Sequence, residues 1–408
     1  MRLLHLFLLS MLMASCASYD AGQDMFALDI AVTADGTAMD EGITVTLRNN
    51  MAATFSAVTD AEGVAHFVLP AGIYEASVSQ VTENEYFRHI YNGTLQDLVV
   101  GTAAQQCAEM RVVTVSQTLE NPLLIKEIYC GGCQKDDGSG TFAKDKCIIL
   151  YNNSPETVSL DSIAFGIIEP YNAEANSHNF LNNGKLDYAD EDWIPAINGI
   201  WYFQDGQSVA PYSEVVVNVY GAIDNTLTYS NSINYANPAY YTMYDPTSKS
   251  NDGISYSNTL YYASPSELIP TSHYLKAVKY GRSNAWTISN TSPAVIIFKP
   301  KGYTPQEYAD GYVNVIYPSM YQGNITYACL KVLRSWVLDA VEVYNSNALA
   351  NSKKRLTPDL DNGYISFTHG YGHTVVRKVE KYVDGHPIYQ DTNNSTNDFY
   401  EAESCSIK

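Results

Sequence analysis

The stretch Leu124–Ile168 reads LIKEIYCGGCQKDDGSGTFAKDKCIILYNNSPETVSLDSIAFGII, and it decides the fold. An apolar run over 124–129 is followed by a polar, glycine-rich loop, a second apolar run over 146–151 and an Asn/Pro turn. Shorter apolar segments follow at 158–160 and 163–166. Runs of this length, bounded by Gly, Asn and Pro, are typical of β-strands. The stretch therefore predicts the opening of a β-sandwich.

Side chains of the first run should alternate between the two faces of a sheet. Ile125 and the other odd-numbered residues are expected on one face, and Leu124 and the other even-numbered residues on the opposite face. Further strands are predicted on both sides of this stretch, at 26–32, 43–47, 54–59, 65–69, 73–78, 111–115, 214–219, 290–298, 337–343 and 373–379. The sequence thus predicts an all-β protein.

Composition limits the class of protein. The chain has 408 residues, of which 46% are hydrophobic, enough to bury substantial cores in two or three domains. Its formal net charge is −20, which repels nucleic-acid backbones, so no nucleic-acid partner is expected. Tyrosine is unusually frequent, with 33 copies, of which 17 lie between Tyr220 and Tyr327.

The N-terminus predicts an exported, lipid-anchored protein. Residues 1–15 combine Arg2 with an apolar run that is too short to span a bilayer, as in a signal peptide. The sequence Met13-Ala14-Ser15-Cys16 resembles a bacterial lipobox, which implies acylation of Cys16 and a lipidated tether over 16–24. An ordinary secretory signal is the alternative. We expect an outer-membrane location facing the cell exterior.

Residues 25–120 form the first expected domain. Its run TDAEGVAHFVLPAGIYEASVS, residues 59–79, resembles the carboxypeptidase-regulatory-like, or prealbumin-like, family. This resemblance implies a β-sandwich that serves as a spacer or docking module.

Residues 121–408 form the second expected domain, which begins after the break at Asn121-Pro122. Its segments IKEIYCGG, KCIILYNNS and VSLDSIAF resemble the start of a lamin-tail domain, an immunoglobulin-like β-sandwich. Tyr/Asn-rich insertions are expected at about 170–208 and 222–289. One helix is predicted, with Thr304 and Glu307 forming a capping box around Pro305.

A wider resemblance covers nearly the whole mature chain. The segments KEIY, LDAVEV, KKRLTPDLDNGY and DTNNSTNDF, in this order, resemble a Bacteroidetes-type outer-membrane lipoprotein family of unknown function. The resemblance implies the location and the two-part β layout, and it implies no activity.

Surface aromatics are the first candidate binding groups. Exposed rings can stack on sugars or anchor protein partners, although rings can equally fill the core of an insertion. The candidates in or beside the insertions are Trp193, Trp201, Tyr240, Tyr241, Tyr261, Tyr262 and Trp286.

Cysteines and carboxylates are the second group of candidates. The six cysteines that remain after Cys16 are expected to form structural disulfides, and Cys130, Cys133 and Cys147 are the candidates for a disulfide or a zinc site. Unpaired thiols are the remaining alternative. The pair His369 and His373 is spaced like a helical metal pair, but its flanking glycines favour a loop and a strand. Calcium binding is a weaker hypothesis for two acidic clusters, Asp187, Asp190 and Asp192, and Asp359 and Asp361.

Catalytic motifs are absent from the sequence: it has no G-x-S-x-G, no phosphate-binding loop and no H-E-x-x-H. We therefore expect a non-enzymatic lipoprotein without a cofactor. It would bind a glycan, a peptide or an outer-membrane uptake barrel through its aromatic insertion. Alternatives are a metal-acquisition accessory protein and a hydrolase of unknown class.

Overall fold

The computed structural model describes residues 24–34, 37–39, 41–83, 88–101, 111–119, 122–173, 186, 188–248, 262–280, 286, 288–310, 315–316 and 328–408. The chain divides into two compact units, one of residues 1–80 and 91–117 and the other of residues 81–90 and 118–408. Strands dominate both units, so the all-β prediction is confirmed. None of the helices among these residues has the length and hydropathy needed to cross a bilayer.

The first unit consists of two sheets around one core. The four-stranded sheet contains β2 (Thr37–Ala38), β1 (Met25–Ala34), β5 (Val64–Pro70) and β8 (Arg111–Thr114), the last pairing with β1. The five-stranded sheet has the order β4 (Thr54–Val58), β3 (Thr44–Asn49), β6 (Gly72–Glu83), β7 (Arg88–Val100) and β9 (Ser116–Leu119). Alternate residues such as Ile30, Val45 and Val78 turn inward and are fully buried, as expected for a sandwich. The prealbumin-like assignment of this unit stays a prediction.

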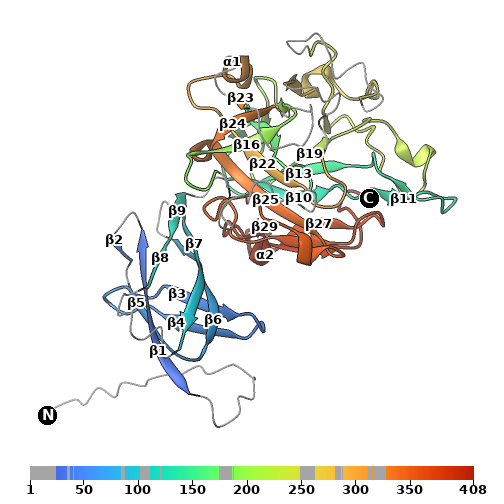
Figure 1. Cartoon of the computed structure of the whole chain (residues 1–408). Coiled ribbons are helices and arrows are strands. Elements are labelled where there is room, and N and C mark those ends of the chain that lie inside the picture. Colours follow the sequence, from blue (N-terminus) through green and yellow to red (C-terminus); the bar gives the residue numbers. More distant parts are fainter. Residues whose placement is uncertain are drawn as a thin grey trace. The chain divides into compact units, whose positions relative to one another are not determined.

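The second unit contains two six-stranded sheets. One has the order β20 (Tyr241–Thr242), β19 (Glu214–Asn218), β13 (Cys147–Asn152), β10 (Leu123–Tyr129), β27 (Thr374–Arg377) and β30 (Phe399–Ala402). The other has the order β21 (Lys276–Val278), β17 (Ile200–Tyr202), β15 (Ala164–Ile167), β22 (Ala294–Phe298), β25 (Val337–Asn345) and β26 (Ile365–Phe367). Figure 1 shows β10 and β13 of the first sheet beside β22 and β25 of the second. The main core of the unit lies between these sheets.

A third layer covers the second six-stranded sheet. It consists of β16 (Trp193–Ile197), β24 (Cys329–Leu333) and β23 (Val315–Ile316), together with helix α1 (Pro305–Asp310). A second buried cluster, which includes Ile194, Ile296 and Leu330, fills the space between this layer and the sheet. Because both of its faces are covered, β22 is buried at every position, which explains its continuous apolar sequence AVIIF.

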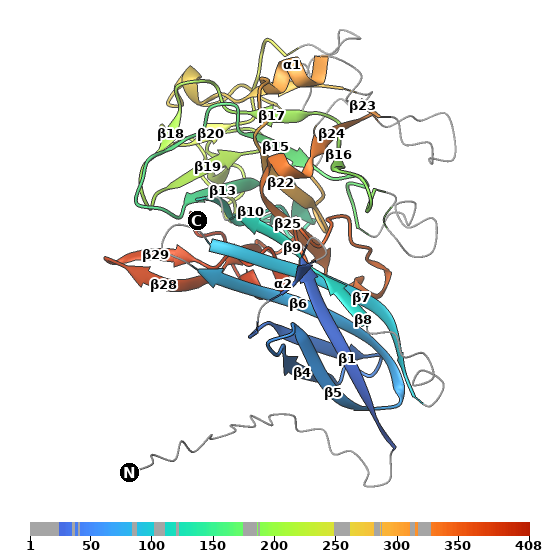
Figure 2. The same cartoon turned by 90° about the vertical axis from the view of Figure 1, so that its left-hand side faces the viewer.

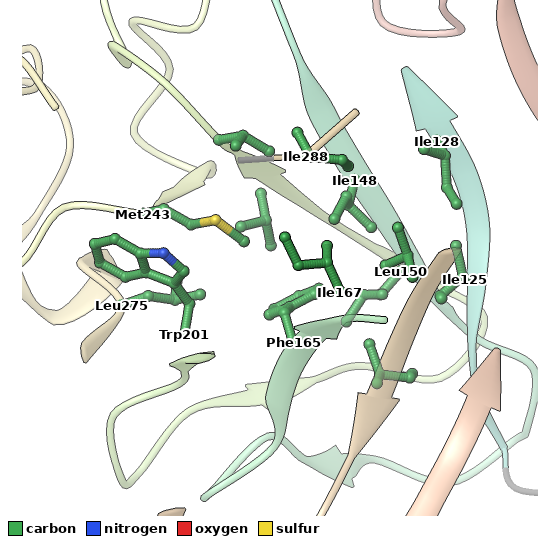
Figure 3. Packing of buried hydrophobic residues seen from close by; sticks show 14 of the residues in the cluster. Ile125, Ile128, Ile148, Leu150, Phe165, Ile167, Trp201, Met243, Leu275 and Ile288 are labelled. Carbon is green, nitrogen blue, oxygen red and sulfur yellow. The ribbon is translucent and has the colours of Figure 1, made fainter. Parts of the chain in front are cut away.

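A β-bulge in β10 changes the predicted facing of its side chains. The register with β13 shifts between Ile125 and Glu127. Ile125 and Ile128 therefore both point into the main core, as Figure 3 shows, whereas strict alternation would place them on opposite faces. Glu127 and Tyr129 face the other side of the sheet, where the C-terminal residues and the insertion cover them.

The predicted helix is confirmed as α1. The Glu307 N–H donates to the Thr304 hydroxyl at 3.2 Å, and the Thr304 N–H donates to the Glu307 carboxylate at 2.8 Å. This reciprocal pair is the capping box expected from the sequence.

The second unit also contains several smaller elements. They are the strand pairs β11 (Cys133–Gln134) with β12 (Thr141–Phe142), β14 (Val158–Ser159) with β18 (Ser208–Val209), and β28 (Val379–Val383) with β29 (His386–Tyr389), and helix α2 (Ser395–Asp398). In Figure 2 the β28–β29 hairpin extends beyond the end of the six-stranded sheet that contains β27. Every residue of β28 is exposed.

Candidate functional site

The aromatic insertion points its rings inward, which corrects the expected binding surface. Trp201 and Trp286 are 0% exposed, Tyr262 is 2% exposed and Tyr241 is 7% exposed. The rings of Trp201 and Tyr262 lie 5.2 Å apart, and Figure 3 shows Trp201 within the main core close to Met243 and Leu275. These four rings complete the core between the two six-stranded sheets. They are therefore not available as a surface platform.

Other residues of the insertion cover the outer face of the first six-stranded sheet. Ile233, Tyr235 and Ile269 pack there against Tyr129 and Cys147, which the strands turn outward. Tyr240 is only partly exposed and packs against the same cluster. The apolar residues of the insertion thus bury an apolar face of the sheet. The sequence of the insertion alone does not show that this face needs to be covered.

Trp193 and Tyr261 are the two remaining aromatic candidates. Trp193 is half-buried, its indole N–H donates to Glu191 at 3.1 Å, and the Lys331 ammonium lies 4.9 Å from its ring centre. The ring is therefore already engaged by its own neighbours. Tyr261 lies outside the described residues, as do Asp187 and the expected lipidation site, Cys16.

Two glycine-rich motifs that stand far apart in the sequence meet in the structure. Cys130-Gly131-Gly132-Cys133 packs against His369-Gly370-Tyr371-Gly372-His373, and the Gly372 N–H donates to the Gly132 carbonyl at 3.0 Å. A Cβ atom on Gly131 would lie 3.1 Å from both the Gly370 nitrogen and the His369 Cα, so any other residue there would push the two loops apart by a few tenths of an ångström. Gly370 and Gly372 have φ of +85° and +86°, which glycine adopts without strain. The second motif is a loop that leads into β27, as expected.

Tyr371 projects from this loop into solvent beside a His–Glu pair. Its side chain is 61% exposed, and its ring centre lies 6.4 Å from that of His373. His373 Nδ1 lies 2.6 Å from Glu401 Oε1, with side chains 28% and 31% exposed, and the Thr368 N–H donates to the same carboxylate at 2.8 Å. We call Tyr371, His373 and Glu401 the loop-end site.

The electrostatics of the loop-end site favour a negative Glu401. Partial burial raises the pKa of Glu401, but hydrogen bonds from His373 and from the Thr368 N–H lower it more, so its pKa is below the usual range. The site therefore offers an exposed aromatic ring next to a charged acceptor and an imidazole. This combination can stack on a sugar ring and accept hydrogen bonds from its hydroxyl groups.

Sequence reasoning missed the loop-end site. The spacing of His369-Gly-Tyr-Gly-His373 suggests only a pair of metal-binding histidines, whereas the exposed group is the tyrosine between them. The feature of the sequence that could have indicated this site is an aromatic residue, Tyr371, between two glycines. Glu401 could not be found from the sequence because it reaches His373 from β30, 28 residues away.

The cysteine candidates are buried free thiols in the structure. Cys130, Cys133 and Cys147 are each at most 1% exposed, and the structure shows no disulfide among these three. Cys107 lies outside the described residues. Burial raises the pKa of both the Cys130 and Cys133 thiols to about 12. Cys147 instead lies 3.8 Å from Cys405, measured between the sulfur atoms.

The metal hypotheses do not fit the part of the chain that is described. Asp361 is fully buried and accepts hydrogen bonds from protein donors, whereas Asp359 pairs with Arg334 at 3.1 Å. The two carboxylates therefore do not converge on one ion, as a calcium loop requires. Asp190 and Asp192 are exposed. Among the residues that the structure describes, no three His, Cys, Asp or Glu side chains are grouped so that they could hold a metal ion.

The sequence segments behind the family resemblance converge in buried polar networks. Arg377 donates to Asp339 at 2.5 Å and to Asp391 at 3.0 Å, and all three side chains are at most 4% exposed. Arg355 pairs with Glu342 at 2.7 Å, with both side chains 0% exposed. Because their charges are paired and shielded from solvent, these groups hold β25, β27 and the C-terminal segment together rather than facing a ligand.

Comparisons with known proteins find a family model that matches part of the second unit. The model of the family described as "Protein of unknown function (DUF4876)" matches residues 210–406. A solved DUF4876 family protein from Bacteroides thetaiotaomicron is 20% identical, with 92% of this chain and 94% of that chain covered and a TM-score of 0.53. No functionally curated protein matches the chain.

Two further solved structures are much less similar. A putative carbohydrate binding protein from Bacteroides uniformis is 12% identical over 47% of this chain and 76% of that chain, with a TM-score of 0.14. The Bacillus anthracis TIE protein is 17% identical over 36% of this chain and 23% of that chain, with a TM-score of 0.17. Scores this low support no argument about fold. Over residues 210–406, then, the chain matches the DUF4876 family of unknown function, and it shares the fold of the solved Bacteroides thetaiotaomicron member.

Proposed function

We propose that the chain is a non-enzymatic cell-envelope lipoprotein that binds a glycan through the loop-end site. The observation that carries this proposal is the 61% exposed ring of Tyr371 beside the His373–Glu401 pair. Protein binding surfaces for sugars combine a flat ring with polar groups at its edge, and this site provides both. The burial of Trp201, Tyr241, Tyr262 and Trp286 leaves fewer rings for the alternative surface that the sequence suggested.

The shape of the site supports binding without a change of backbone conformation. Tyr371 is held between Gly370 and Gly372, and Gly372 is hydrogen-bonded to Gly132 in the neighbouring loop. A fixed loop loses little conformational entropy on binding, which favours recognition by a single ring.

Location and anchoring belong to the same proposal. The signal peptide and lipobox at 1–16 would place the mature chain on the outer membrane through an acylated Cys16. The test is metabolic labelling with a clickable fatty acid, which should label the wild-type chain and spare the Cys16→Ser variant. Equal labelling of both chains would refute the lipid anchor at Cys16. It would not bear on glycan binding, which is measured in a separate experiment.

The binding test uses the mature chain without its lipid. We expect a glycan array to identify glycans that bind. Titration calorimetry with one of these glycans should then show at least about tenfold weaker binding for Tyr371→Ala, which corresponds to a loss of about 1.4 kcal/mol in binding free energy. Tyr382→Ala is the matched control, because Tyr382 is 69% exposed but lies on the β28–β29 hairpin. Blank arrays, or equal losses in both variants, would argue against a glycan-binding loop-end site.

A further inference from the structure

The C-terminal segment closes over the outer face of the first six-stranded sheet. Cys405 and Ile407 pack with Tyr129 and Cys147 in the cluster that covers this face. The Ser406 N–H donates to Glu127 Oε1 at 3.1 Å, and the Ser406 hydroxyl donates to Glu127 Oε2. The chain end lies close to β10 in both Figure 1 and Figure 2.

We propose that Cys147 and Cys405 are joined by a disulfide in the exported protein, which fixes the C-terminal segment to β13. The two sulfur atoms are 3.8 Å apart, and the residues are 0% and 3% exposed. A disulfide bond is about 2.05 Å long, so its formation requires the two side chains to bring the sulfur atoms closer together. Among the described cysteines, Cys130, Cys133 and Cys329 form no comparable pair.

The chemistry is a thiol–disulfide exchange. The two thiols lose two protons and two electrons as the Cys147–Cys405 bond forms, and a disulfide oxidant of the cell envelope takes them up as its own bond breaks to give two thiols. An oxidising compartment is what the predicted export leader implies.

Burial determines when the bond forms. Both sulfurs are shielded from solvent in the folded chain, and thiol–disulfide exchange requires an accessible thiolate. Oxidation therefore takes place during folding, before the C-terminal segment covers the sheet. The bond is a permanent closure of the fold rather than a reversible switch.

Peptide mapping provides a direct test. The exported chain is purified from cell envelopes, alkylated without reductant and digested with trypsin. We expect peptide 147–185 linked to peptide 382–408, lighter than the sum of the two reduced peptides by two hydrogen atoms. Alkylation of both cysteines, or linkage of either one to another cysteine, would overturn the proposal.

Stability measurements separate the bond from simple packing. Unfolding the wild-type chain in denaturant with reductant, and refolding it in reductant, should lower its Tm, whereas the same treatment should leave the Tm of Cys405→Ser unchanged. Cys329→Ser is the matched control, since Cys329 is also fully buried and its variant should keep the reductant-sensitive Tm. A wild-type Tm that stays the same after unfolding and refolding in reductant would contradict the proposed disulfide.

Discussion

Asp361 accepts two hydrogen bonds from Ser395, one from the backbone N–H at 2.8 Å and one from the hydroxyl at 2.6 Å. The two residues belong to the segments KKRLTPDLDNGY and DTNNSTNDF, whose order in the sequence supported the family resemblance. Asp361 also accepts from the backbone N–H groups of Glu342 and Gly363. One buried carboxylate thus joins three segments of the second unit.

Replacing Asp361 should therefore destabilise the chain strongly. Asp361→Ala leaves the buried N–H groups of Gly363 and Ser395 without their acceptor, and leaves the Glu342 N–H with only the Ser395 hydroxyl at 3.3 Å. Each lost acceptor costs about 1–3 kcal/mol, so we expect a loss on the order of 4 kcal/mol. The measurement is urea unfolding followed by circular dichroism.

Asp359→Ala is the control for this prediction. Asp359 lies two residues away and forms a partly exposed pair with Arg334, so its loss should cost at most about 1 kcal/mol. Added calcium should not raise the Tm of the wild-type chain. Equal effects of the two substitutions, or stabilisation by calcium, would show that the acidic segment acts as a metal loop after all.

The inward orientation of the insertion can be tested by tryptophan fluorescence. Trp201, Trp286 and Trp336 are at most 6% exposed, and Trp193 is the half-buried one. We expect iodide to quench only a minor part of the native emission, and Trp193→Phe to remove most of that part. Quenching that persists in Trp193→Phe and disappears in Trp286→Phe would mean that the insertion exposes its rings.

A further prediction concerns the dependence of stability on pH through Asp145. Burial raises the pKa of this carboxyl to about 6. Hydrogen bonds from the Tyr129 hydroxyl and the Ile233 N–H favour the charged form and lower the pKa, but their effect is smaller than that of burial. A folded pKa above the unfolded value means that the folded chain binds more protons between the two values. This contribution to stability is therefore present at low pH and is lost as the pH rises through about 6.

Comparison with Asp145→Asn isolates the contribution of this one group. Asparagine does not titrate, so the stability of the wild-type chain relative to the variant should fall by about 1 kcal/mol from about pH 5 to about pH 8. Urea unfolding of both chains at the two pH values measures the difference. A relative stability that is constant, or that increases with pH, would show that Asp145 is charged throughout.

The capping box of α1 gives a prediction of intermediate size. Thr304→Ala removes the hydroxyl that accepts from the Glu307 N–H, and N-cap losses of this kind cost about 1 kcal/mol. Thr304→Ser keeps the hydroxyl and should unfold at nearly the wild-type urea concentration. If the alanine and serine variants unfold together, the cap does not contribute to stability.

The sequence by itself determined the all-β class, many of the strands and the one predicted helix, but it did not predict β16, β17 or β24. Alternation marks β1 and β25, an apolar run bounded by turn residues marks β13, and the Thr304–Glu307 spacing marks α1, because these signals depend on contacts within a few residues. The export function of the leader and the acylation of Cys16 stay predictions from the sequence, since both segments lie outside the described residues.

The tertiary structure alone decided which side chains face solvent. Trp286 and Tyr371 are both aromatic residues in loops, yet the first completes a core between two sheets and the second projects from a glycine-held turn. That difference, like the contact of Cys147 with Cys405 across 258 residues, arises from the pairing of distant segments. A local pattern carries no information about which distant surface will cover it, and so the sequence could not fix the site.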